Sequence, residues 1–306
     1  MHKFNPKFIL SIAAFSIIVS TLHAQIKTVA FAQDTMGNDF RKAQVYEVRD
    51  AVAKHADLKF VTSDAKGQTS LLIHHISGFI DTKADVIIVG TNDEKAVIPI
   101  IAKAYESNIP VIILDRGILG DKYTTFINSD NIKIGSLGAE YIAKRLGGKG
   151  TVLLFEGLQK ADVTKLRSKG FMQEIRKYKG IRVIKRTGNY LRKDAILEME
   201  KLISSGETID AIFSESDSML SGARSAMIHH NMDPSKIISV GCDYTSEARE
   251  AIRKGTQSGS VLFPLGGKKS VDVALKIFKG EKIPKHIIIP VKLITRENVD
   301  KEAAIF

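Results

Sequence analysis

Three short apolar runs of this chain each lead into an acidic residue, which places polar chemistry at the ends of predicted strands. The runs are residues 109–114, 209–213 and 237–240. The first is followed at once by Asp115 and Arg116, and the other two lead to Asp217 and Asp243. Short, wholly apolar runs are typical of strands in parallel sheets, and open α/β sheets bind ligands beyond the carboxyl ends of their strands.

Carboxylates and guanidinium groups at such a place could hold a small polar molecule. A carboxylate accepts hydrogen bonds from two hydroxyls, and a guanidinium donates a planar fork. Two plainer interpretations stay open. The acids could cap the helices that follow them, and Asp115 could simply form an ion pair with Arg116.

Apolar runs alternate with longer amphipathic stretches from residue 26 onward. We expect strands at 26–32, 57–62, 85–90, 109–114, 123–127, 151–156, 181–187, 209–214, 236–241 and 258–263. We expect helices at 38–55, 67–81, 94–107, 132–147, 162–179, 192–205, 217–231, 244–254 and 267–279. This rhythm predicts parallel sheets with helices on their faces. The elements are too many for one three-layer domain and do not fit an eight-fold barrel, so they favour two domains.

The first 24 residues have the organisation of a secretory signal. Lys3 and Lys7 precede an apolar run from Phe8 to Val19, and Ala24 is a plausible cleavage point. The run is shorter than the ~20 apolar residues that span a bilayer. We therefore expect an exported protein, cleaved near Ala24 and retained in the periplasm. An uncleaved N-terminal anchor is the alternative.

The bulk composition is that of an ordinary globular protein. The 306 residues carry 45 Lys and Arg against 34 Asp and Glu, a formal charge of +11, and removal of the signal would leave +9. The basic residues are interleaved with acids, so no nucleic-acid partner is expected. Cys242 is the only cysteine, which excludes an intramolecular disulfide.

Five short motifs occur along the chain in a fixed order. They are Pro110–Arg116, Asn128–Asn131, Gly170–Phe171, Val240–Asp243 and Lys279–Lys282. Together they resemble the periplasmic sugar-binding proteins of the ribose-binding type, over residues 26–300. The resemblance implies two Rossmann-like three-layer α/β/α lobes with parallel sheets, joined by a hinge that the chain crosses three times. The N-terminal lobe would hold residues 26–128 and 264–290, and the C-terminal lobe residues 129–263 and 291–306.

The same resemblance implies which residues would contact a ligand between the lobes. Asn38 matches a polar contact of the family and Phe40 a stacking face. Asp115 and Arg116, called the clamp below, match a pair of ligand-binding residues, and Asp243 matches a carboxylate from the opposite lobe.

Other positions depart from the family's pattern. Arg41 stands where the family has an aromatic ring, and Lys165 falls where it has a ligand-binding arginine. Tyr190 falls at an aromatic position, whereas Ser216 replaces an asparagine and Leu262 a glutamine. We count Arg41, Lys165, Tyr190 and Ser216 among the candidate ligand-binding residues.

These departures predict a change of ligand class. If Arg41, Arg116 and Lys165 all face the cleft, they outnumber the carboxylates of Asp115 and Asp243. A neutral pentose would leave such cations without partners away from water, which is costly. We therefore expect ribose to bind weakly, and an oxygen-rich or anionic ligand to bind better.

The sequence thus predicts a periplasmic solute-binding protein whose lobes close on a sugar or sugar-like small molecule and which delivers it to an ABC permease. The alternative is a periplasmic ligand-sensing adaptor, for a furanosyl autoinducer or a similar signal, that acts on a membrane sensor kinase or chemoreceptor. No catalytic, metal-binding or cofactor motif is evident, so we expect a binding protein without cofactor rather than an enzyme. We also expect a monomer.

Overall fold

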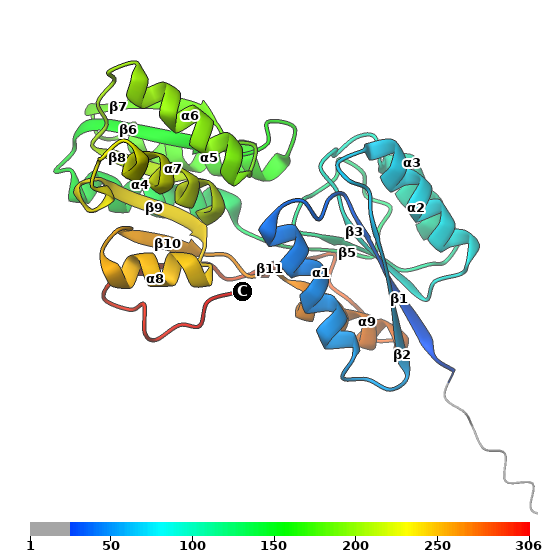
Figure 1. Ribbon diagram of the computed structural model, residues 1–306. Coiled ribbons are helices and arrows are strands. Elements are labelled where there is room, and N and C mark those ends of the chain that lie inside the picture. The colour runs from blue at the N-terminus through cyan, green and yellow to red at the C-terminus, as the bar shows by residue number, and fades with distance from the viewer. Residues whose placement is uncertain (1–24) are drawn as a thin grey trace, which may run out of the picture.

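The computed structural model describes residues 25–306, which form two lobes that lie side by side (Figure 1). Segments of chain join the lobes near the centre, and the C-terminus lies close to these segments. The predicted signal, residues 1–24, lies outside the described residues. Within residues 25–306, no helix combines the length and the apolar character that a membrane crossing requires.

The first lobe contains a sheet of six strands. They are β1 (Lys27–Gln33), β2 (Leu58–Asp64), β3 (Val86–Gly90), β4 (Val111–Leu114), β5 (Thr125–Ser129) and β11 (His286–Ile289). The strand order is β11-β5-β4-β3-β1-β2, and every neighbouring pair is parallel. Helices α1 (Asp39–Val52) and α9 (Gly267–Phe278) pack together, as do α2 (Thr69–Asp81) and α3 (Ile98–Glu106).

The second lobe repeats this design. Its strands are β6 (Lys149–Glu156), β7 (Gly180–Thr187), β8 (Ala211–Ser214), β9 (Ile238–Asp243), β10 (Gly259–Leu262) and β12 (Lys292–Thr295), in the order β12-β10-β9-β8-β6-β7. Helix α4 (Asn131–Arg145) packs on α5 (Asp162–Ile175), and α6 (Arg192–Ser204) packs on α7 (Asp217–His229). Helix α8 (Ser246–Lys254) lies beside β10, and a short 3-10 turn, η1 (Pro234–Lys236), precedes β9.

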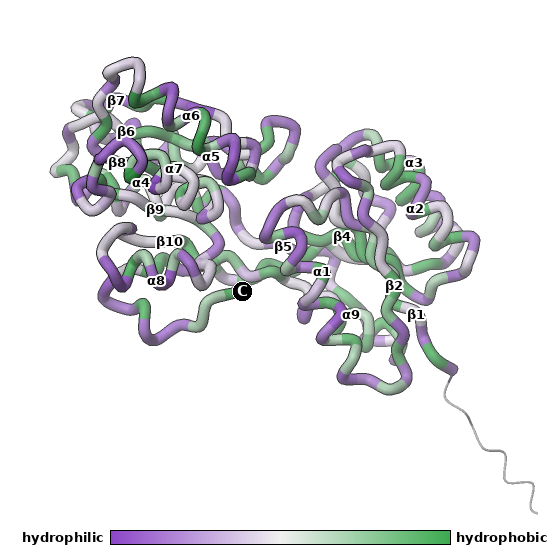
Figure 2. Tube along the Cα trace, viewed as in Figure 1, coloured by the Kyte–Doolittle hydropathy of each residue, from purple (hydrophilic) through white to green (hydrophobic). Residues whose placement is uncertain are grey.

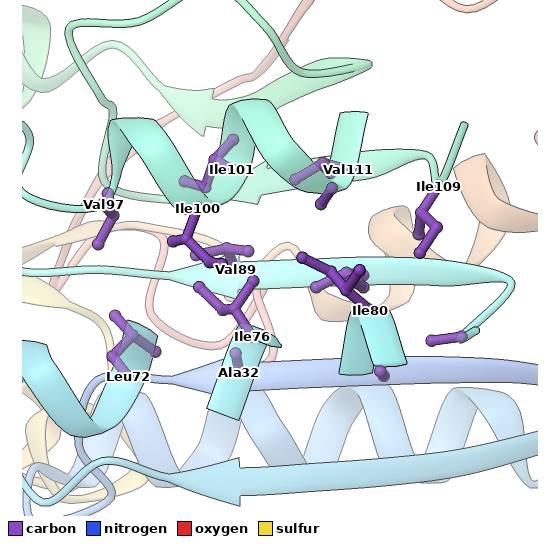
Figure 3. Packing of buried hydrophobic residues seen from close by; sticks show 14 of the residues in the cluster. Ala32, Leu72, Ile76, Ile80, Val89, Val97, Ile100, Ile101, Ile109 and Val111 are labelled. Carbon is purple, nitrogen blue, oxygen red and sulfur yellow. The ribbon is translucent and has the colours of Figure 1, made fainter. Parts of the chain in front are cut away.

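The central strands of each sheet are buried on both faces, which explains why strands such as β3 and β4 are wholly apolar. On one face of the first sheet, Ile76 and Ile80 of α2 and Ile101 of α3 pack against Val89 and Val111 (Figure 3). The spacing of four residues between Ile76 and Ile80 places both on the same side of the helix. Figure 2 shows the hydrophobic stretches within the lobes, whereas the peripheral loops are mostly hydrophilic.

The chain passes between the lobes three times: from β5 to α4, from β10 to α9, and from β11 to β12. The last passage corrects the expectation of purely parallel sheets, because β12 pairs antiparallel to β10, with Leu262 opposite Lys292. Strand β10 leaves its sheet toward the crossing region, and β12 enters from that region beside it, so the two run in opposite directions. The predicted two-lobe α/β fold is otherwise confirmed.

Candidate functional site

A small cavity of about 20 Å³ lies between the two lobes, at the carboxyl ends of their strands. It is lined by Asn38, Phe40, Arg41, Asp115 and Arg116 from the first lobe and by Val163, Arg167, Tyr190, Ser216, Asp243 and Phe263 from the second. The structure thus brings together eight of the nine predicted residues, and Lys165 is the exception. This closed cavity has room for about one water molecule, so a sugar-sized ring would need the lining of the cavity to move apart.

Two buried ion pairs shape the first-lobe side of the cavity. Arg41 Nη2 lies 2.9 Å from Asp115 Oδ2, and Arg116 Nη1 donates a hydrogen bond of 3.1 Å to Asp34 Oδ2. Arg41 Nε also lies 3.7 Å from Asp34 Oδ1, which joins the two pairs into one network. The two clamp residues therefore do not pair with each other, and the charge of Arg41 is balanced within the protein.

The clamp retains hydrogen-bonding capacity that the protein does not use. Asp115 Oδ1 and Arg116 Nε are buried and have no hydrogen-bond partner among residues 25–306. Leaving a buried polar atom unpaired costs about 1–3 kcal/mol, so a ligand hydroxyl at these atoms would be favourable. Asp115 also has a left-handed backbone, with φ at 69°. Such strained backbone conformations cluster at functional sites.

Arg167 is the cation that the second lobe contributes, and the sequence analysis missed it. Its Nε donates to Asn131 Oδ1 at 2.8 Å, and its Nη1 donates to the backbone oxygen of Glu215 at 2.7 Å. Its guanidinium carbon lies 4.6 Å from the centroid of the Phe263 ring. These contacts fix the plane of the guanidinium and leave Nη2 for other partners.

Lys165 does not reach the cavity, which corrects the assignment made from the sequence. Its side chain is 55% exposed and its Nζ lies 3.1 Å from Glu94 Oε1 in the first lobe. Residues two positions apart on a helix point about 200° apart, so Lys165 and Arg167 lie on opposite sides of α5. The helical spacing could have identified Arg167 as an inward-facing residue. It lies three residues after the buried Thr164 and four residues before the buried Phe171.

Asp243 is the last residue of strand β9, and Asp217 stabilises the turn that follows it. The φ angles of Asp243 and Tyr244 are 108° and 66°, a conformation that side-chain-bearing residues rarely adopt. Asp217 Oδ2 accepts hydrogen bonds from Tyr244 N and Ser260 Oγ, both at 2.7 Å, and Oδ1 accepts one from Gln257 Nε2 at 2.9 Å. Burial raises the pKa of Asp217 to about 6, and burial also raises the pKa of Asp243.

None of the three acids that follow the apolar runs caps a helix, so that plainer interpretation is wrong. Helix α7 is capped by Ser216, whose Oγ accepts a hydrogen bond from Met219 N at 3.2 Å, and α8 is capped by Thr245. Asp115 is followed by a loop that leads to β5 without a helix. Ser216 therefore both caps helix α7 and lines the cavity.

The aromatic side chains at the cavity, Phe40 and Tyr190, are each fixed by contacts with other protein groups. The rings of Phe40 and Phe263 are stacked, with centroids 5.0 Å apart and planes inclined by 13°. The hydroxyl of Tyr190 lies 2.8 Å from Thr164 Oγ1 and 3.3 Å from Glu215 Oε2. Phe40 thus presents only part of its surface to the cavity, and it is backed by a ring from the opposite lobe.

A buried pair of carboxyl groups lies behind Tyr190. Glu215 Oε2 accepts a hydrogen bond from Gly157 N at 2.9 Å. Ser168 Oγ lies 2.8 Å from Oε1 of Glu215 and 2.8 Å from Oε1 of Glu156, although one hydroxyl hydrogen serves only one acceptor well. The pKa of Glu215 is raised to about 7, chiefly by burial and in smaller part by the charge of Glu156, against the hydrogen bonds from Gly157 and Ser168.

The acidic and basic groups around the cavity are equal in number, which corrects the expectation of surplus positive groups. Three buried carboxyl groups face three buried guanidinium groups: Asp34, Asp115 and Asp243 against Arg41, Arg116 and Arg167. Lys165 lies outside and Arg41 is paired, so the premise for an anionic ligand is removed. In the part of the chain that the structure describes, no cluster of three or more His, Cys, Asp or Glu side chains could hold a metal ion.

The lobes touch across the cleft, so the structure represents a closed arrangement. Asn38 Nδ2 donates to the backbone oxygen of Tyr190 at 2.7 Å, and Gly117 N donates to Asp162 Oδ2 at 2.8 Å. Two further contacts join Ser218 Oγ to Asp39 Oδ2 at 2.9 Å and Lys165 to Glu94. Each contact pairs one residue of the first lobe with one of the second.

Known proteins resemble this chain along most of its length. The ribose import binding protein of Haemophilus influenzae is 28% identical over 93% of this chain and 97% of that protein. The crystal structure of an ABC transporter solute binding protein from Bacillus halodurans with bound myo-inositol is 28% identical, with a TM-score of 0.86 over 92% of this chain and 98% of that one. The fructose binding periplasmic domain of a hybrid two component system is 26% identical, with a TM-score of 0.84 over 90% and 93%.

The family comparison agrees with the ordered motifs of the sequence. Residues 29–282 match the family described as the periplasmic binding protein domain. This match accounts for most of both lobes and for two of the three passages between them. The chain therefore belongs to the periplasmic binding protein domain family, a family of binding proteins rather than enzymes.

Proposed function

We propose that this protein captures a neutral sugar or cyclic polyol between its lobes and delivers it to an ABC permease. The observation that carries the proposal is the unpaired Asp115 Oδ1 and Arg116 Nε in a closed cavity. Asp115 Oδ1 accepts a hydrogen bond and Arg116 Nε donates one. A ligand hydroxyl can donate to the first atom or accept from the second.

The second lobe would contact the same ring from the other side. Arg167 offers the donor Nη2, and Asp243 offers a carboxyl group beside it. A ligand that bonds both lobes binds the closed form more tightly than the open form, and this difference shifts the population toward closure. We propose that the lobes move about the three passages between them, with the boundaries given in the sequence analysis.

A neutral ligand suits the site better than an anion. The three guanidinium groups at the cavity are matched in number by three buried carboxyl groups, so the site holds no excess of cations for an added anion. The names of the relatives above include ribose, myo-inositol and fructose. All three are neutral polyhydroxyl compounds.

The partners and the location follow from the same reasoning. Export with cleavage near Ala24 would place a monomeric binding protein in the periplasm, where it would present its closed surface to the permease. One comparison favours the sensing alternative, because a relative of the same fold belongs to a hybrid two component system. Titration of the ligand-bound protein against each class of membrane partner would separate the two.

A thermal-shift screen tests the proposal. The panel holds neutral pentoses, hexoses and inositols beside sugar acids and sugar phosphates of the same ring sizes. A ligand at 100 times its dissociation constant should stabilise the fold by ~2.7 kcal/mol. The proposal predicts stabilisation by a neutral member, and stabilisation by anionic members alone would overturn it.

A further inference from the structure

We propose that Asn38 is a latch that holds the lobes closed through a hydrogen bond across the cleft. The inference rests on the proposed function and assigns Asn38 a role different from that of the polar contact expected from the sequence. A latch acts after the ligand has entered, so it should control how fast the ligand leaves.

Both polar atoms of the Asn38 side chain already have partners in the protein. Its Oδ1 accepts a hydrogen bond from Arg41 N at 3.1 Å and so caps the first turn of α1. Its Nδ2 donates to the backbone oxygen of Tyr190 at 2.7 Å, across the cleft. The cap fixes the direction of the amide group, and the donor is therefore aimed at the opposite lobe.

The acceptor on the opposite lobe, the backbone oxygen of Tyr190, is also held in place. The backbone at Asn189 and Tyr190 is left-handed at both residues, with φ at 54° and 60°. The ring of Tyr190 is anchored below by Thr164 and Glu215. A Cβ at Gly157 would lie 1.9 Å from this ring, so only glycine leaves room for it. With the ring anchored, the backbone oxygen of Tyr190 has little freedom to move.

The position of this hydrogen bond explains why it would act as a latch. Asn38 and Tyr190 line the buried cavity and also line two outer hollows of the cleft, of about 620 Å³ and 250 Å³. The bond therefore spans the cleft where the cavity would open toward solvent. It is part-buried, unlike the exposed Lys165–Glu94 pair, and part-burial protects it from competing water.

The latch can be removed without removing the cap. Asp and Ser cap helices about as well as Asn. Asn38→Asp loses the amide donor and adds a charge, whereas Asn38→Ser loses the donor, stays neutral and is too short to reach Tyr190. Glu94→Gln is the matched control, because it weakens the exposed Lys165–Glu94 contact across the same cleft and leaves the backbone unchanged.

The experiment measures association and dissociation rates by stopped-flow fluorescence. The probe is whichever of D-ribose, D-fructose and myo-inositol stabilises the wild type most. We expect both Asn38 variants to release it about two- to tenfold faster, as loss of one neutral hydrogen bond implies, with unchanged association. Glu94→Gln should behave as the wild type.

Three results would overturn the latch. They are unchanged dissociation in both Asn38 variants, slower association in place of faster dissociation, and an effect of Asn38→Asp that Asn38→Ser does not share. Failure of the proposed function looks different, because no panel member would then stabilise the wild type before any variant is made.

Discussion

The guanidinium of Arg41 lies 2.9 Å from the carboxylate of Asp115, and both groups are buried at the floor of the cleft. Helix α1 thus supplies the counter-charge for the residue that we expect to hold ligand hydroxyls. Because that charge is already balanced, the ligand need not bring one. The pair also leaves Asp115 Oδ1 free of protein partners among residues 25–306.

Asp115→Asn should weaken binding of a neutral ligand by about ten- to hundredfold. The change removes a charged acceptor, and such hydrogen bonds contribute ~1.5–3 kcal/mol. Asn tolerates the left-handed backbone at this position, so the local fold should be kept. Calorimetric titration measures the loss, and an unchanged affinity would exclude Asp115 from the site.

Arg167→Lys should reduce affinity at least about tenfold, whereas Lys165→Arg two residues away should change it little. Lysine cannot reproduce the planar fork that bonds Asn131 and Glu215 and still donates to the cavity. Lys165 forms an exposed ion pair, and such pairs contribute ~0–1 kcal/mol. If Lys165→Arg alters binding more than Arg167→Lys does, the original assignment from the sequence was right.

Gly157→Ala should lower both stability and affinity. The added Cβ would stand 1.9 Å from the ring of Tyr190, and crowding of this kind costs ~1–3 kcal/mol. The control is Gly78→Ala on α2, where a Cβ meets nothing within 4 Å. Urea titration and calorimetry should show the loss in Gly157→Ala alone, and equal behaviour of the two variants would mean that Tyr190 can move freely.

Glu215 should make the protein less stable as the pH rises from 6 to 8. Its folded pKa of about 7 lies above the usual 4.5, so the folded state binds the proton more tightly than the unfolded state. The resulting stabilisation is complete below pH 4.5 and is lost as the pH rises through 7. Between pH 6 and 8 this group alone should lower the free energy of unfolding by about 1 kcal/mol.

Glu215→Gln supplies the control for this pH effect. Glutamine does not titrate, so the difference in free energy of unfolding between pH 6 and pH 8 should shrink by about the same amount. Urea titrations of both proteins at the two pH values measure it. An identical pH dependence in the variant would show that Glu215 titrates outside this window.

Particular residues show which parts of this structure a sequence can predict. The alternation of apolar runs and amphipathic stretches predicted the two α/β lobes, because buried strands and half-buried helices impose different periods on the chain. The direction of β12 was not predictable in this way, because a four-residue strand has the same pattern in either direction. It depends on where the chain re-enters the lobe after β11.

The candidate site was predictable where residues follow strands directly. Asp115 and Asp243 stand at the ends of β4 and β9, and their place in the cavity follows from the sheet. Asp34 follows β1 in the same manner and was overlooked, although the same rule applies to it. The place of Arg167 depends on which side of α5 is buried, and aligning a family motif at Lys165 ignored that helical spacing.

The most direct test of the account is a calorimetric comparison of one neutral ligand with the acid of the same ring. The neutral compound identified in the screen and its uronic or aldonic counterpart are titrated at low and high salt. The account predicts tighter binding of the neutral compound, with an affinity that changes little with salt because no net charge is neutralised. Tighter binding of the acid, weakening as salt rises, would contradict it.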